Sequence, residues 1–135
     1  MSSMFPTPDP RLDPELAPYW DAAARGELLL ARCRPCGVVA WPPRSRCPAC
    51  MSDDRDDLVA SGDGVIYTFT VNRRAAPPYA EVKALVIAYV DLPEGPRVLT
   101  NLIADDLDRV QIGAPVHAFF DTSPSGAGVL RFRLV

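Results

Sequence analysis

The 135-residue sequence predicts a mainly β protein, in which a short helix and a cysteine-rich module precede a five-stranded barrel. All four cysteines lie in two Cys-x-x-Cys pairs between residues 33 and 50. The 15 prolines cluster largely at 6–18, 35–48 and 77–78, which disfavours long helices. Beyond residue 58, apolar and polar residues alternate with the period of a strand. We therefore expect three parts, at 1–26, 27–54 and 55–135.

The first part is expected to be an N-terminal tail followed by a helix. Asp13 is a suitable N-cap, Pro14 fits the first helical position and Gly26 can end the helix. One apolar face combines four residues with helical spacing, Leu16, Tyr19, Trp20 and Ala23. This face either packs on the ribbon and barrel of the same chain or docks on a partner through its two aromatic residues.

The second part contains a candidate metal site made by Cys33, Cys36, Cys47 and Cys50. Two residues separate the cysteines within each pair, and ten residues separate the pairs. This spacing is typical of two tight turns that offer four thiolates to one tetrahedral ion. We predict a rubredoxin-like ribbon with a structural Zn²⁺; iron, a thioredoxin-like redox pair and two disulfides are the alternatives. The segments "ELLLARC" (27–33) and "VVAWPP" (38–43) are expected to be extended, and 53–58 to be a solvated boundary.

The third part is expected to be a barrel built from strands at 63–72, 82–91, 97–103, 114–121 and 129–135. Residues 104–110 are expected to form a short helix between the third and fourth strands, and the Gly-rich segment 123–128 to join the last two. This order matches the OB-fold, a five-stranded Greek-key barrel. Tyr67 and Phe69 suit a barrel core, although aromatic residues on such a strand also stack on nucleic-acid bases.

Charge and hydropathy disfavour two classes of partner, nucleic acids in general and membranes. The net charge of −3 lacks the basic footprint of a general nucleic-acid binder. No apolar run approaches the roughly 20 residues that span a bilayer. The first residues do not combine a basic segment with an apolar one, so we expect no secretory signal and a cytoplasmic protein, in which thiols stay reduced.

The combined pattern resembles the zinc-ribbon/OB-fold proteins of domain of unknown function 35, an acyl-CoA-associated family. The matching segments are "YWDAAARGELLLARCRPCGVVAWPPRSRCPAC", "SGDGVIYTFTV", "IGAPVHAFF" and "RFRLV". They extend over most of the chain, from about Leu16 to Leu134. Cys-x-x-Cys-Gly, Pro-Pro and Cys-Pro-x-Cys are specific in combination. Met51 departs from the glycine that is common after the last cysteine, which disfavours iron but not zinc.

This resemblance implies an accessory subunit that forms a hetero-oligomer with a thiolase-like enzyme. Family members of this kind serve acyl transfer or the retro-aldol cleavage of sterol side-chain CoA esters, and their OB domain helps to hold acyl-CoA or to complete a partner's site. A single-stranded nucleic-acid module is the alternative function, because OB-folds with zinc ribbons also bind such strands.

We expect no catalytic residue in this chain on its own. Its cysteines are assigned to the metal, and the lone His117 lies in a predicted strand, where histidine is usually structural. The phosphates of CoA require cationic donors, and Arg73 and Arg74, which follow the first barrel strand, are our candidate residues. Arg44 and Arg46 in the ribbon are weaker candidates for the same role.

Overall fold

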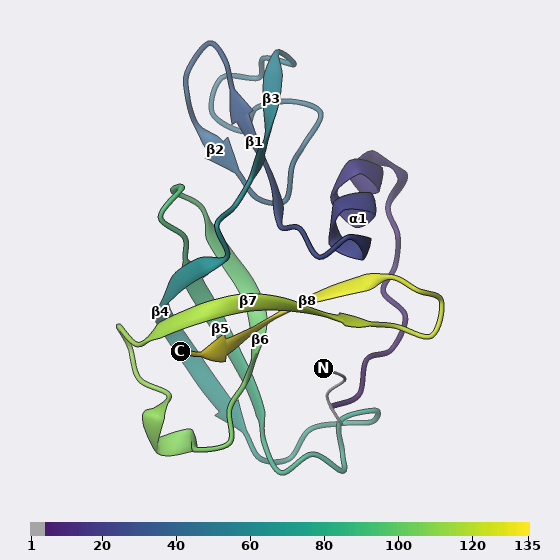
Figure 1. Ribbon diagram of the computed structural model, residues 1–135, viewed down its shortest axis with the longest axis vertical. Helices are drawn as coiled ribbons and strands as arrows, with labels where there is room; N and C mark the ends of the chain where they lie inside the picture. Colours follow the sequence, from purple (N-terminus) through teal and green to yellow (C-terminus); the bar gives the residue numbers. More distant parts are fainter. Residues whose placement is uncertain (1–4) are drawn as a thin grey trace.

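The computed structural model describes residues 5–135 and has two β units with one helix beside them (Figure 1). The elements are η1 (Pro14–Leu16), α1 (Ala17–Ala24), β1 (Leu29–Cys33), β2 (Val39–Ala40), β3 (Arg55–Val59), β4 (Asp63–Asn72), β5 (Leu85–Asp91), β6 (Arg97–Ile103), η2 (Leu107–Arg109), β7 (Pro115–Thr122) and β8 (Gly128–Leu134). Within residues 5–135, no helix is both long and apolar enough to cross a membrane.

The larger unit is a closed barrel with the strand order β4-β5-β6-β8-β7. Its neighbouring strands are antiparallel except for β6 and β8, which run parallel. The predicted OB-fold is thereby confirmed. Three of the five expected strands shift slightly: β5 begins at Leu85 rather than at residue 82, and β7 and β8 each differ by one residue at their ends. The helix expected at 104–110 is only one 3₁₀ turn.

A β-bulge in β4 changes which residues face the core. The register between β4 and β5 shifts between Ile66 and Thr68, so β4 carries one extra residue there. Ile66 is buried, whereas Phe69 and Val71, which have the opposite parity, pack against the core beyond the bulge. Tyr67 is 47% exposed, so the expectation that it fills the barrel core is wrong.

The smaller unit is a three-stranded sheet with the order β2-β1-β3. All five residues of β3 pair with β1, from Leu29 opposite Val59 to Cys33 opposite Arg55. The sequence predicts a solvated loop at the boundary 53–58, but residues 55–58 belong to β3 of the ribbon. The segment 38–43 contributes only two strand residues. The placing of domain boundaries at 26/27 and 54/55 stays a prediction.

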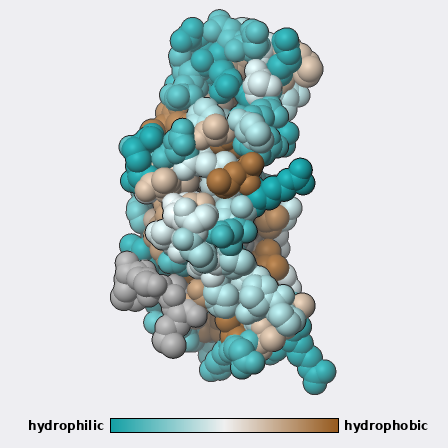
Figure 2. Space-filling model, turned by 90° about the vertical axis from the view of Figure 1, so that its right-hand side faces the viewer, coloured by the Kyte–Doolittle hydropathy of each residue, from teal (hydrophilic) through white to brown (hydrophobic). Residues whose placement is uncertain are grey.

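The apolar face of the N-terminal helix is buried within this chain. Asp13 caps η1 by accepting a hydrogen bond from the Glu15 N–H, and Gly26 ends α1 with a φ of 81°. Tyr19 is 5% exposed, and Trp20 and Leu16 pack against the same core. Figure 2 draws the side of the molecule on which α1 lies, where hydrophobic residues form small separate patches. Packing within this chain thus occupies Tyr19, whereas docking of a partner on the partly exposed Trp20 stays a prediction.

A buried arginine joins the N-terminal segment to the barrel. Arg131 in β8 is 1% exposed and donates from Nε to the Asp121 carboxylate at 2.7 Å. Its other nitrogens donate to the Asn101 side chain, to the Pro6 carbonyl and to Thr7 Oγ1. The N-terminal segment consequently runs along the barrel, as Figure 1 shows.

Candidate functional site

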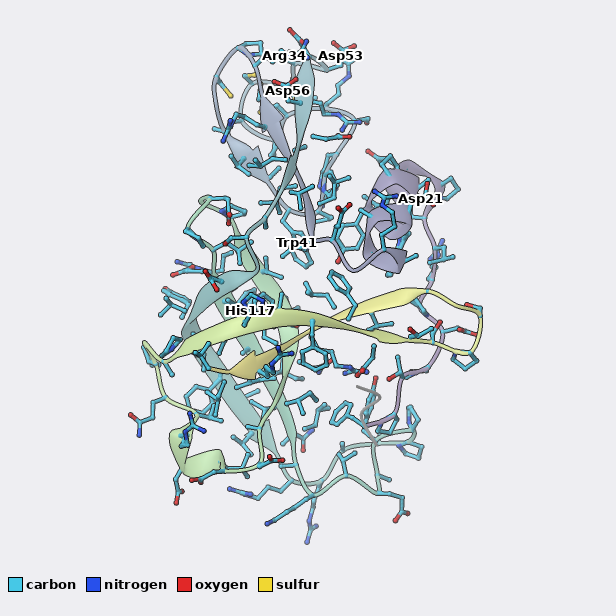
Figure 3. The ribbon with its side chains drawn as sticks, in the orientation of Figure 1. Asp21, Arg34, Trp41, Asp53, Asp56 and His117 are labelled. Carbon is cyan, nitrogen blue, oxygen red and sulfur yellow. The ribbon has the colours of Figure 1, made fainter. Side chains whose placement is uncertain are left out.

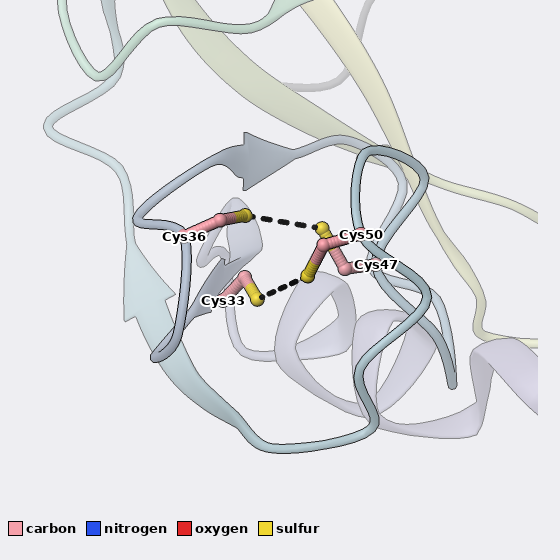
Figure 4. A group of neighbouring side chains, drawn as sticks. All are labelled: Cys33, Cys36, Cys47 and Cys50. Atoms are coloured by element: carbon pink, nitrogen blue, oxygen red, sulfur yellow. Dashed lines mark hydrogen bonds between the residues drawn. The ribbon is translucent and has the colours of Figure 1, made fainter.

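The four cysteine sulfurs converge on one point (Figure 4). All four lie within 4.8 Å of one another, with Cys33 and Cys50 at 3.5 Å and Cys36 and Cys47 at 3.6 Å. Sulfurs around a tetrahedral zinc lie about 2.3 Å from the ion and hence about 3.8 Å apart. The thiols are free rather than joined as disulfides. The donor set and its size therefore fit one zinc ion in a closed, structural site.

Two equivalent turns present these sulfurs. The Gly37 N–H donates to the Cys33 carbonyl at 2.8 Å, and the Met51 N–H donates to the Cys47 carbonyl at 2.9 Å. The turning residues Gly37 and Met51 have φ values of 77° and 67°. Met51 thus occupies the position of a glycine, and it does so with a backbone conformation that side chains disfavour.

The thiols differ in their pKa values because their surroundings differ. Hydrogen bonds from the backbone N–H groups of Cys50 and Ala49 lower the pKa of Cys47 to about 6. At Cys33, a hydrogen bond from the Cys36 N–H lowers the pKa, but burial and the neighbouring thiols outweigh it and raise the pKa to about 12. Four adjacent thiolates repel one another, so full ionisation of the cluster requires a bound cation.

Charged side chains across β1 and β3 strengthen the same unit. Arg34 donates to Asp56 at 2.9 Å and to Asp54 at 3.0 Å, and Figure 3 shows Arg34 and Asp56 side by side. All three are exposed, so each pair contributes modestly to stability. Sequence reasoning missed this contact, although the opposite signs of "ARCR" and "DDRDD" were a usable signal.

The predicted coenzyme-binding arginines lie far from the cysteines. Arg73 and Arg74 are exposed in the loop after β4, at the end of the barrel opposite the ribbon (Figure 1). The Arg74 N–H donates to Asn72 Oδ1 at 2.9 Å, which shapes the start of this loop. Arg44 and Arg46 instead line a small hollow beside the cysteines, and Arg46 donates to the Met51 carbonyl.

A cavity of about 150 Å³ lies where the loop from Arg73 returns to the barrel. Its wall is mainly apolar and includes Val86, Leu102, Ile103 and Leu107, with Phe5 and Lys83 also lining it. Asn72 at the end of β4 pairs with Leu85 at the start of β5. The loop that begins at Arg73 therefore returns to the barrel beside its own start, through Ala84, which lines the cavity. Sequence reasoning did not find this cavity, because its wall comes from segments far apart in the chain.

His117 forms a pair with a carboxylate rather than with a nucleophile. His117, labelled in Figure 3, has its Nδ1 2.9 Å from Asp63 Oδ1, and its ring lies close to Gly62. In the part of the chain that the structure describes, no serine, threonine or cysteine side chain shares a hydrogen bond with His117. A structural rather than catalytic role for His117 stays a prediction.

The chain matches two family models. The model described as the ChsH2 rubredoxin-like zinc ribbon domain matches residues 20–55, and that of the ChsH2 C-terminal OB-fold domain matches residues 59–121. The ribbon match and the four-thiol cluster together support a structural zinc.

Similar proteins include both larger and equally long chains. A probable enoyl-CoA hydratase alpha subunit of Thermomonospora curvata is 36% identical over 109 residues, which are 81% of this chain; the chain spans only 34% of that protein. The benzoylsuccinyl-CoA thiolase subunit BbsA of Thauera aromatica is 28% identical over 76% of this chain and 74% of its own. A solved structure, the Ltp2-ChsH2(DUF35) aldolase, has a TM-score of 0.81 and 32% identity, covering 93% of this chain and 98% of that one.

Proposed function

This chain belongs to the DUF35 family of ChsH2-type proteins, which join a zinc ribbon to an OB-fold, and on this premise we propose that it is a non-catalytic accessory subunit of a thiolase-like enzyme. It binds that enzyme and helps to hold an acyl-CoA substrate during the formation or cleavage of a C–C bond. The reaction is that of a thiolase, an acyltransferase or a sterol side-chain retro-aldolase. The observation that carries this proposal is the likeness of the whole chain to DUF35 chains, one of which is named as part of an aldolase with a second protein.

The chemistry of the chain supports a non-catalytic role. Its strongest nucleophiles, the four thiols, face one another within the metal cluster. Covalent catalysis needs an activated nucleophile beside a base. Among residues 5–135, the one histidine is paired with Asp63 instead. The reacting groups must then come from the partner enzyme.

The geometry of the barrel end supports acyl-CoA as the ligand. Arg73 and Arg74 offer cationic donors for the nucleotide phosphates, and the hydrogen bond from the Arg74 N–H to Asn72 Oδ1 orders the start of their loop. The adjoining cavity of about 150 Å³ has a mainly apolar wall, whose chemistry suits the end of an acyl chain. We place the CoA ester between this end of the barrel and the partner.

Co-purification tests the proposed role. A tagged chain should retain a thiolase-like protein in fixed stoichiometry, as identified by mass spectrometry. The complex should turn over acyl-CoA esters, and the isolated chain should not. Robust turnover by this chain alone, with the partner shown to be absent, would contradict the proposal.

Charge reversal tests the coenzyme site within that complex. We expect the Arg73→Glu/Arg74→Glu variant to raise the KM for a full CoA ester by roughly tenfold, because one hydrogen bond to a charged group contributes about 1.5 kcal/mol. The kcat should change less, since binding of a remote handle is largely uniform.

Two controls make this test specific. A truncated pantetheine ester lacks the nucleotide phosphates, and Arg11→Glu reverses a charge at another exposed position. Neither should show the change in KM. An unchanged KM for the full ester, or an equal loss for both esters, would refute the assignment of Arg73 and Arg74.

A further inference from the structure

The outer face of β4, β5 and β6 carries a cluster of exposed apolar side chains. We call it the tyrosine face and define it by Val65, Tyr67, Tyr89, Leu99 and the pair Asp91–Arg97. The four apolar members are 43–48% exposed. Tyr89 and Leu99 lie opposite each other on β5 and β6, and Asp91 lies opposite both Val65 and Arg97. The cluster is therefore continuous across three strands.

The polar members of the tyrosine face hold it in one conformation. Arg97 donates to Asp91 at 2.6 Å, and its guanidinium lies 3.4 Å from the centroid of the Tyr67 ring. Arg97 thus reaches from β6 across to β4. A surface ordered in this way loses little side-chain entropy when it is covered.

The elements that pack on the barrel lie elsewhere. α1 contacts β7 and β8, and the N-terminal segment is held at Arg131 in β8. Because the barrel is closed, β4, β5 and β6 each have a neighbour on both sides, although β4 pairs with β7 only over residues 63–65 and β6 pairs with β8 only over residues 101–103. Any partner of this face must recognise its side chains.

The charge of the tyrosine face selects the class of partner. Asp91 and Arg97 neutralise each other, and the exposed residues of β4 beyond the bulge, Thr68, Thr70 and Asn72, are uncharged. The exposed Asp63 at the start of β4 adds a negative charge rather than a positive one. A nucleic-acid strand or a phosphate group needs an excess of cations, which this face lacks. Tyrosine, arginine and apolar residues with few net charges are instead typical of the centre of a protein interface.

We propose that the tyrosine face is the centre of the surface on which the thiolase-like subunit docks. This inference rests on the proposed function for the class of partner, but the surface is assigned by its exposure, order and neutrality. Tyr67 and Tyr89 are 47% and 43% exposed, and since each aromatic side chain has about 150–250 Å², together they offer roughly 140–220 Å². A stable interface buries about 800 Å² on each partner, so flanking residues of the barrel complete it.

The test measures the Kd between purified chain variants and the thiolase-like protein that co-purifies with the wild type. Tyr89→Thr and Leu99→Thr remove apolar surface and place threonine, a β-branched residue that favours strands, at both positions. Each should raise the Kd at least tenfold. Ile112→Thr, at a 71% exposed position in a turn outside the face, is the matched control and should stay within twofold. Unchanged zinc content and melting temperature verify that each variant is folded, and Tyr89→Phe serves as a milder change.

The outcomes separate the two proposals. If the wild type binds the thiolase-like protein and both threonine variants bind equally well, the tyrosine face is not the docking surface, although the proposed function stands. If the wild type retains no thiolase-like protein, both fail. A dimer of this chain that dissociates in Tyr89→Thr, or oligonucleotide binding that is lost in Tyr89→Thr, would also overturn the assignment.

Discussion

Met51 has the one positive φ that a residue other than glycine adopts within residues 5–135. This conformation costs a side chain about 1 kcal/mol or more. Because Met51 is 63% exposed, its side chain contributes little packing in return. We expect Met51→Gly to raise the free energy of unfolding by about 1 kcal/mol in denaturant titrations with saturating zinc. Gly37→Ala, at the equivalent turn, should lower the free energy of unfolding. A Met51→Gly protein that is less stable than the wild type would contradict this account.

The zinc ligands allow a second test at the same scale. Purified protein should contain one zinc ion per chain, and Cys47→Ser should lower this content, because a closed site needs all four thiolates. Elemental analysis measures the content, and hydrogen exchange should then show faster exchange of ribbon amides. Ser52→Ala changes a neighbour that is not a ligand and serves as the control. If Cys47→Ser still contained one zinc ion per chain, Cys47 would not be a zinc ligand.

Among the elements, α1 and β8 approach so closely that only glycine fits between them. A Cβ atom at Gly128 would lie 2.2 Å from the Ala23 carbonyl oxygen at the end of α1. Gly128→Ala must therefore displace the helix, and we expect a loss of about 1–3 kcal/mol in unfolding free energy. Thr122→Ala, on the exposed residue paired with Gly128, should change stability much less. Equal losses of unfolding free energy in Gly128→Ala and Thr122→Ala would show that α1 can move away from β8 at little cost.

The link between η1 and the ribbon predicts a dependence on pH. The Glu15 carboxylate accepts hydrogen bonds from the Ser45 N–H at 3.1 Å and from Ser45 Oγ at 2.9 Å, which lower the pKa of Glu15 below its ordinary value of 4.5. Since the folded protein favours the ionised form, the stabilisation is present above pH 4.5 and disappears as the pH falls through the lowered pKa.

This dependence is measurable with one substitution. Glu15→Gln should lower the melting temperature at pH 7, and its difference from the wild type should shrink as the pH approaches 3. Glu81→Gln, at another exposed position, is the control and should show no such trend. A difference that stays constant from pH 7 to pH 3 would mean that the charge of Glu15 is irrelevant to the link.

At the scale of the whole molecule, Arg131 ties the N-terminal segment, β6 and β7 to β8 through one buried cation. Removing its counter-charge leaves a buried charge without compensation, which costs about 3–5 kcal/mol. We expect a loss of this size for Asp121→Asn in denaturant unfolding. The double variant Asp121→Leu/Arg131→Met should lose less than Asp121→Asn, because neither charge remains. A more severe loss in the double variant would show that the arginine's other bonds dominate.

The features that could be predicted from the sequence are those that local patterns encode. The two-residue spacing within each Cys-x-x-Cys pair identifies the four zinc ligands and the two turns that carry them. A tight turn brings two cysteines that are close in the sequence close together in space. Alternation of apolar residues predicts the barrel strands, and their order around one short helical turn predicts the OB-fold. Asp13 and Gly26 predict the ends of the helical segment for the same local reason.

Other features could not be predicted from local patterns, because they depend on segments that meet across the fold. One extra residue at the bulge of β4 turns Tyr67 outward, and alternation alone cannot reveal such a shift. Acidic residues at 53–58 suggest solvent, yet pairing with β1 supplies their backbone hydrogen bonds and makes them a strand. An arginine in a strand normally suggests exposure, but Arg131 is buried because Asp121, Asn101 and Pro6 converge on it from distant parts of the chain.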